Sequence, residues 1–161
     1  MINPPPAADL LEELAAFRGS VARVLDVPVD WLQRPKDKAD EWSLTEVMCH
    51  LRDVEREVHQ PRVQDILTDP DAFLPGIDAD TWAEPRRYRE QDGRAALDDY
   101  LAARAETLRM LQGLSEADWE RQGQHTFFGP TTLREIVYLA VQHDRVHGRQ
   151  IARLLGEDDA G

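Results

Sequence analysis

Four stretches of this sequence space their apolar residues three and four positions apart, which is the period of an amphipathic helix. No stretch alternates apolar and polar residues convincingly, as a half-buried strand does. The connections are longer than tight hairpins, and the middle one leaves room for a crossover. We therefore predict an all-α fold, a four-helix bundle with long connections. The four stretches are residues 9–25, 43–67, 90–112 and 131–155.

The ends of these stretches carry helix signals. Gly113 follows the third stretch as a C′ residue, and Pro61 inside the second should kink or split that helix. The third stretch is expected to turn five apolar side chains towards the interior: Leu97, Leu101, Ala105, Leu108 and Leu111. Three starts have the spacing of a capping box: Asp9 with Glu12, Ser43 with Glu46, and Thr132 with Glu135.

The length of the chain indicates one domain. We expect a single bundle over residues 1–161, with a core at about 9–155 and a frayed tail at 157–161. No apolar run approaches the ~18 residues that cross a bilayer, and the first residues lack the pattern of a secretory signal. One cysteine excludes an internal disulfide. We therefore expect a cytoplasmic protein.

The charge balance argues against a nucleic-acid partner. The sequence has 31 acidic and 19 basic residues, a formal net charge of −12, and no long basic cluster. Binding to phosphate backbones or to an anionic membrane surface requires a basic face. A small-molecule substrate or a protein partner is what remains.

The segment QHDRVHGRQIARLL near the end places two histidines four positions apart on the apolar face of the last helix. His143 and His147 then project side by side, and burying an unsatisfied imidazole costs ~1–3 kcal/mol. One divalent cation can satisfy both rings, but a third ligand is then required. His50, at the border of the apolar face of the second helix, is the best candidate. His59, near the expected helix break, and His125, in a glycine-rich loop, are weaker candidates.

Each of these residues also has a purely structural interpretation. The histidines can be satisfied core side chains that donate to a carbonyl or to a carboxylate such as Asp144. Asp53 and Gln150 each follow a candidate histidine by three positions, so they can orient a ligand ring or remain surface groups. Cys49 lies off the apolar face, and no neighbour is expected to activate it.

Two longer patterns resemble a known family. EWSLTEVMCHLRDVE, residues 41–55, resembles the W-S-x-x-E-x-x-x-H-L-x-D-x-E pattern that opens the second helix of DinB/YfiT-like proteins. FGPTTLREIVYLAVQHDRVHGRQI, residues 128–151, resembles their closing segment, which ends in H-x-x-x-H-x-x-Q. The resemblance implies a four-helix bundle that holds zinc or nickel through His50, His143 and His147, and it implies a homodimer.

The resemblance and the three-histidine site together lead to three functional hypotheses. Three neutral imidazoles leave coordination positions open, as in a catalytic metal site. Because characterised relatives include thiol-dependent S-transferases and a mycothiol-dependent isomerase, the leading hypothesis is an S-transferase that uses a low-molecular-weight thiol against small electrophiles. A metal-dependent hydrolase would use the same residues, and a non-catalytic, metal-stabilised binding module is the third hypothesis. Many members have a further histidine where this sequence has Val146, so any substrate contact made from that position is in doubt.

Overall fold

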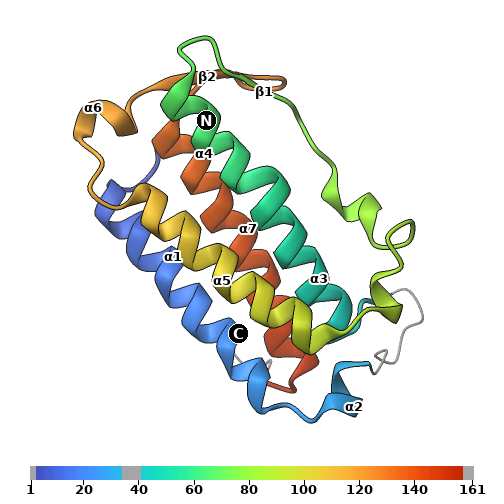
Figure 1. Cartoon of the computed structure of the whole chain (residues 1–161). Coiled ribbons are helices and arrows are strands. Elements are labelled where there is room, and N and C mark those ends of the chain that lie inside the picture. Colours follow the sequence, from blue (N-terminus) through green and yellow to red (C-terminus); the bar gives the residue numbers. More distant parts are fainter. Residues whose placement is uncertain (1–2, 34–40, 158–161) are drawn as a thin grey trace.

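The computed structural model describes residues 3–33 and 41–157, and it is a helical bundle (Figure 1). The long helices of this part of the chain are α1 (Ala7–Ala22), α3 (Leu44–Val54), α4 (Gln60–Thr68), α5 (Gly93–Leu111) and α7 (Leu133–Leu154). α3 packs most extensively against α5, and α1 against α7. With α3 and α4 forming one continuous segment, these helices make up the predicted four-helix bundle, which is confirmed.

Local sequence signals set most of the helix starts. Two of the three predicted capping boxes are present, and in each a hydroxyl accepts from a backbone N–H while a carboxylate accepts from the N-cap N–H. The third prediction, at Asp9, was wrong. α1 begins earlier, at Ala7, because the proline run ends there and the last proline serves as its N-cap without a side-chain hydrogen bond. The two boxes that form are Ser43 with Glu46 and Thr132 with Glu135.

α5 begins at Gly93, three residues later than predicted, with Asp92 as its N-cap. A Cβ atom on Gly93 would lie 2.4 Å from Oγ1 of Thr45, so the first turns of α3 and α5 touch backbone to backbone. The helix ends at Leu111, and Gly113 has a φ of 76°, as predicted for a C′ residue.

The buried face of α5 agrees with the predicted one at Leu97 and Leu111, which are buried, but differs from it between them. Leu101, Ala105 and Leu108 are only half buried, whereas Tyr100 and Arg104 are fully buried. Arg104 can lie inside because two carboxylates from other helices neutralise it. A hydrophobic pattern carries no information about such a pairing, and this is why the prediction failed in the middle of the helix.

A π-helical turn, Glu55–His59, joins α3 to α4. The predicted interruption near Pro61 is therefore real but lies just before it, and the proline occupies the first turn of α4, where its missing N–H is tolerated. At about 100° per residue, His59 would sit about 180° around a regular helix from His50. The wider turn changes this angle, and the His59 ring packs edge-on against that of His143, with ring centroids 5.5 Å apart.

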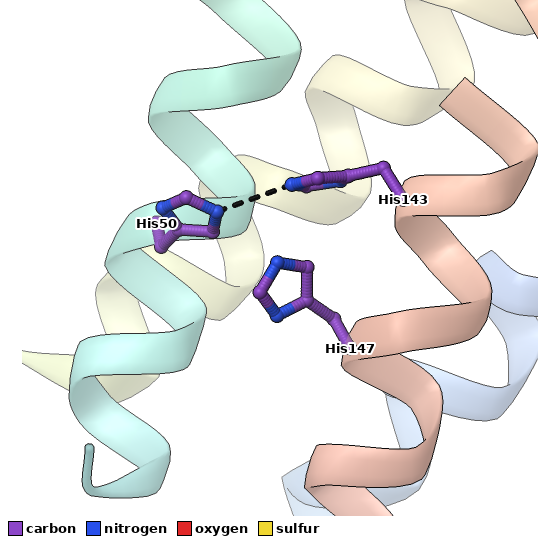
Figure 2. Close-up of side chains that lie close together, drawn as sticks. All are labelled: His50, His143 and His147. Carbon is purple, nitrogen blue, oxygen red and sulfur yellow. Dashed lines mark hydrogen bonds between the residues drawn. The ribbon is translucent and has the colours of Figure 1, made fainter. Parts of the chain in front are cut away.

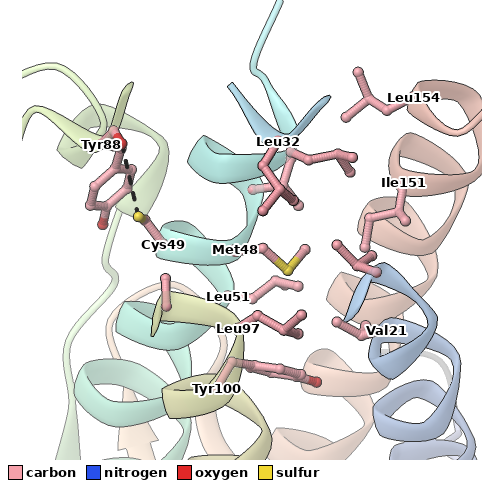
Figure 3. Packing of buried hydrophobic residues seen from close by; sticks show 14 residues of the cluster. Val21, Leu32, Met48, Cys49, Leu51, Tyr88, Leu97, Tyr100, Ile151 and Leu154 are labelled. Atoms are coloured by element: carbon pink, nitrogen blue, oxygen red, sulfur yellow. Dashed lines mark hydrogen bonds between the residues drawn. The ribbon is translucent and has the colours of Figure 1, made fainter. Parts of the chain in front are cut away.

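The core consists of two clusters of buried apolar side chains, one towards each end of the bundle. Figure 3 shows the cluster at the start of α3 and α5, in which Met48, Leu97 and Ile151 interlock. Cys49 belongs to this cluster and is fully buried, with its thiol 3.9 Å from the carbonyl oxygen of Tyr88. The expectation that Cys49 lies off the buried face was wrong, because Tyr88 covers the outer side of α3.

A small sheet closes one end of the bundle, as the position of β1 and β2 in Figure 1 shows. It was not predicted, since its strands are only two to four residues long and rich in glycine and glutamine. β1 pairs in parallel with β2, and β2 pairs with β3 in an antiparallel hairpin. The strands are Phe73–Leu74 (β1), Gln122–His125 (β2) and Gly129–Thr132 (β3).

Short helical elements occupy the connections. The predicted tail at 157–161 lies almost wholly outside the described residues. No helix in residues 3–33 and 41–157 is long and apolar enough to cross a membrane. The short elements are α2 (Val29–Leu32), α6 (Glu116–Trp119) and the 3₁₀ turns Arg23–Asp26, Ala79–Trp82 and Tyr88–Glu90.

Candidate metal centre

Two helices bring three histidines into one cluster (Figure 2). His50 comes from α3, whereas His143 and His147 come from successive turns of α7. The Nε2 atoms of His50 and His143 lie 3.1 Å apart, and one ring nitrogen from each of the three residues lies within 4.8 Å of the others. Nitrogens that bind one tetrahedral zinc ion at ~2.0–2.1 Å lie ~3.3 Å apart. The cluster therefore has the dimensions of a divalent metal site after small side-chain rotations.

The environment keeps these rings neutral. Burial, together with repulsion from His147 and His59, lowers the pKa of His50 from 6.5 to about 3. The pKa of His143 lies further below its ordinary value, first because of burial and then because of His59. Burial also lowers the pKa of His147. A neutral imidazole carries the lone pair that a cation requires, so protons do not compete with a metal for these nitrogens near neutral pH.

Gln150 fixes the orientation of one ring. The Nδ1 atom of His147 donates to Oε1 of Gln150 at 2.8 Å, which leaves Nε2 with the free lone pair. This is the contact expected of an outer partner of a metal ligand. The Nδ1 atoms of His50 and His143 are buried without a hydrogen-bond partner among residues 3–33 and 41–157. A cluster of under-satisfied imidazoles is unfavourable by itself, and a shared cation would offset that cost.

Asp53 has a different role from the one considered for it. Its carboxylate accepts hydrogen bonds from Arg52 at 2.8 Å, from Arg86 at 2.9 Å and from the hydroxyl of Tyr88 at 2.6 Å. Burial alone would raise its pKa, but these bonds bring it below the ordinary value. Asp53 therefore fastens the segment around residues 86–88 to α3, and none of its described hydrogen bonds reaches His50.

Two side chains that the sequence did not single out lie beside the cluster. Trp42, directly before the N-cap of α3, stacks parallel to His147 at 6.4 Å and lies 4.9 Å from the His50 ring. Asp80 comes from the 3₁₀ turn after β1, and its Oδ1 lies 3.9 Å from Nε2 of His50. Trp42 stands in the W-S motif, so its position could have been anticipated. No local pattern connects Asp80 to a helix 30 residues earlier.

A cavity of about 330 Å³ opens beside the cluster. Its size suits a small molecule. His50 and His143 form part of its wall, and the two histidines judged weaker from sequence, His59 and His125, also line it. His59 reaches the wall because of the π turn, and His125 because β2 ends there. All five histidines of the sequence thus lie at the cluster or at its cavity.

A buried ion-pair network lies behind the cavity. Arg104 of α5 forms two hydrogen bonds with Glu55 of the π turn and two with Asp144 of α7, at 2.8–3.0 Å. Burial raises the pKa of Asp144 to about 6, although Arg104 opposes this. Asp144 is thereby engaged by Arg104, which leaves its sequence neighbour His143 free to point into the cluster.

The sequence matches the DinB superfamily profile over residues 18–151, which include all three clustered histidines. The chain belongs to the DinB superfamily. Its fold is similar to that of YfiT from Bacillus subtilis, described as "a probable metal-dependent hydrolase with an unusual four-helix bundle topology". The TM-score is 0.79 at 20% sequence identity, over 96% of this chain and 88% of that chain. No protein with a curated description matches this DinB-superfamily sequence.

Proposed function

We propose that this DinB-superfamily protein is a metal-dependent enzyme that acts on a small electrophilic substrate in the cavity beside the histidine cluster. The observation that carries the proposal is the convergence of three neutral imidazoles, two of which, His50 and His143, form part of the wall of that cavity. His50, His143 and His147 would hold a divalent ion, with zinc and nickel as the candidates. Such an ion lowers the pKa of a water or thiol and so supplies a nucleophile near neutral pH.

The residues of the chain itself would perform the remaining tasks. Gln150 holds the tautomer of His147, and Trp42 covers one side of the cluster and excludes water from it. The carboxylate of Asp80 is the described acidic group that forms a close contact with a clustered histidine. Its Oδ1 would accept the proton that the nucleophile releases.

Water is the nucleophile that we favour, which makes the protein a hydrolase. The description of YfiT as a probable hydrolase, on the same fold, supports this choice. A low-molecular-weight thiol is the second candidate, which would make the protein an S-transferase. Three uncharged ligands leave the full charge of the ion uncompensated, and such an ion would stabilise a thiolate as well as a hydroxide.

Elemental analysis tests the metal site. Purified wild-type protein should contain close to one zinc or nickel ion per chain, and His147→Ala should lose it. His125→Ala is the matched control, since it removes a cavity histidine outside the cluster and should retain the ion. Wild-type protein that takes up no metal, even after incubation with either ion, would refute the proposal.

Activity assays separate the two nucleophiles. The metal-loaded protein would be assayed with esters, lactones and amides in water, and with thiols combined with aryl halides or epoxides. Turnover without thiol supports the hydrolase, and turnover only with thiol supports the S-transferase. Asp80→Asn should lower kcat by ~10²-fold or more without releasing the metal. A metal-loaded protein that is inactive with every pair would indicate a binding module instead.

A further inference from the structure

We propose that the cavity beside the histidine cluster binds the carboxylate of a small substrate through Arg62 and His125. The identification of this molecule as a substrate rests on the proposed function. The binding of the carboxylate does not, because it can be measured without turnover.

Arg62 is a cation without a counterion in the cavity wall. It is half buried on α4, and its Nη2 atom donates to the carbonyl oxygen of Pro75 at 3.0 Å. Its Nε atom is buried and has no hydrogen-bond partner in the part of the chain that the structure describes. No described carboxylate forms an ion pair with it, whereas Arg86 and Arg104 each pair with two. In a chain with a net charge of −12, an unpaired guanidinium in a cavity indicates that an anion binds there.

His125 adds a second donor to the same wall. Its Nδ1 atom accepts a hydrogen bond from the backbone N–H of Phe127 at 3.1 Å, so the proton of the neutral ring is on Nε2. No acceptor for Nε2 is present among the described residues. Arg62, this ring and His59 line the same cavity, and burial together with the charge of Arg62 lowers the pKa of both histidines. Two donors without acceptors match the oxygens of a carboxylate.

The rest of the cavity sets the direction in which a substrate would lie. Asp80 is next to His50, at the end of the cavity where the cluster lies, and the other carboxylate of the lining, Asp78, forms no described ion pair with Arg62. Arg62 lies one helical turn, ~5 Å, beyond His59, whose ring contacts His143. A carboxylate on Arg62 would therefore place the electrophilic end of a compact molecule near the cluster. Apolar side chains enclose the space between: Val54, Val58, Ile77, Phe127, Phe128 and Leu139.

Binding of benzoate, measured by titration calorimetry on the full-length protein, tests this subsite. Benzamide has the same shape without the charge, and inorganic phosphate is an anion without an apolar body. The variants are Arg62→Gln, Arg62→Lys and His147→Ala. Arg109→Gln is the matched control, because it removes an exposed arginine of α5 outside the cavity.

The expected result is saturable binding of benzoate that is at least ~10-fold tighter than binding of benzamide or phosphate. Arg62→Gln should weaken it by ~10-fold or more, and Arg62→Lys by less, since lysine keeps the charge but loses the planar fork. Arg109→Gln should leave it within about twofold. His147→Ala should also retain it, which would show that the metal is not the site of binding.

Three results would overturn the proposal. The first is unchanged binding of benzoate in Arg62→Gln. The second is loss of benzoate binding in His147→Ala but not in the Arg62 variants. The third is tighter binding of phosphate or benzamide than of benzoate. Failure of the proposed function looks different, because a protein without metal or activity would still bind benzoate through Arg62.

Discussion

At the scale of single residues, Gln150 determines which nitrogen of His147 can face a metal, because its side-chain oxygen accepts the Nδ1 proton. Gln150→Leu removes the acceptor at similar volume, so the ring can turn or change tautomer. We expect metal affinity to fall by ~10-fold or more, measured by competition with a chromogenic chelator. Arg149→Leu, at the exposed neighbouring position, is the control. Equal affinity in Gln150→Leu and wild type would contradict the role assigned to this contact.

The buried imidazoles should make the metal-free protein sensitive to acid. In the unfolded chain a histidine takes up a proton near pH 6.5, but burial lowers the folded-state pKa of His50 to about 3 and that of His59 to about 4. At a pH between the folded-state pKa of each ring and 6.5, the unfolded state binds more protons than the folded state. The stabilisation is therefore present above pH 6.5 and is lost as the pH falls through the folded pKa values.

Well below pH 6.5, the slope of the free energy of unfolding against pH should approach ~1.4 kcal/mol per pH unit for each buried imidazole. Urea denaturation of chelator-treated protein between pH 7.5 and 4.5 would measure it. His59→Asn should reduce the slope, because it removes one of the groups. A free energy of unfolding that stays constant over this range would show that the rings are not buried in neutral form.

The residues that could be predicted from sequence are those on regular helices. His143 and His147 are candidates because of their spacing and their place on the apolar face of one helix, and His50 because of its place at the border of another, and the three lie together in the structure. Asp80 and Arg62 were missed for two physical reasons. Asp80 lies on a loop, where no periodicity relates a side chain to a distant helix, and Arg62 follows a π turn that shifts the helical phase.

At the scale of elements, the contact between α3 and α5 depends on a missing side chain. Gly93→Ala would place Cβ 2.4 Å from Oγ1 and 3.0 Å from Cα of Thr45, and the backbone cannot yield cheaply. We expect a loss of ~1–3 kcal/mol in the free energy of unfolding, measured by chemical denaturation. Gly19→Ala in α1 is the matched control, since nothing lies within 4 Å of its Cβ position. That change should be neutral or stabilising by up to ~1 kcal/mol.

A Gly93→Ala variant as stable as the wild type, or an equal loss of stability in Gly19→Ala, would contradict the role of the close contact, because helix propensity alone favours alanine at both positions. Whether a feature of the helices and strands could be predicted depends on whether it is local or tertiary in origin. Capping boxes and the C′ glycine act within a few residues, so sequence reveals them. The start of α5 and the small sheet depend on tertiary contacts and strand pairing between distant segments, and local sequence does not specify these.

At the scale of the whole molecule, the network of Arg104, Glu55 and Asp144 joins three helical segments between the two apolar clusters. Arg104→Met would leave two carboxylates buried without a cation. We expect a loss of ~3–5 kcal/mol in stability, and urea denaturation at pH 7 would measure it. Adding Glu55→Gln and Asp144→Asn should recover much of the loss, because the uncompensated charges are then gone. A loss below ~1 kcal/mol in Arg104→Met would contradict this account.

The position of the cluster also matters for the lifetime of the molecule. His50 and His143 are 93 positions apart in sequence, so an ion bound to both would cross-link the first half of the chain to its last helix. A ligand that binds only the folded form stabilises it by mass action. Molecules that lose the ion would then open more often and be degraded sooner. Such turnover would remove the inactive molecules first, so that the surviving population is enriched in loaded enzyme.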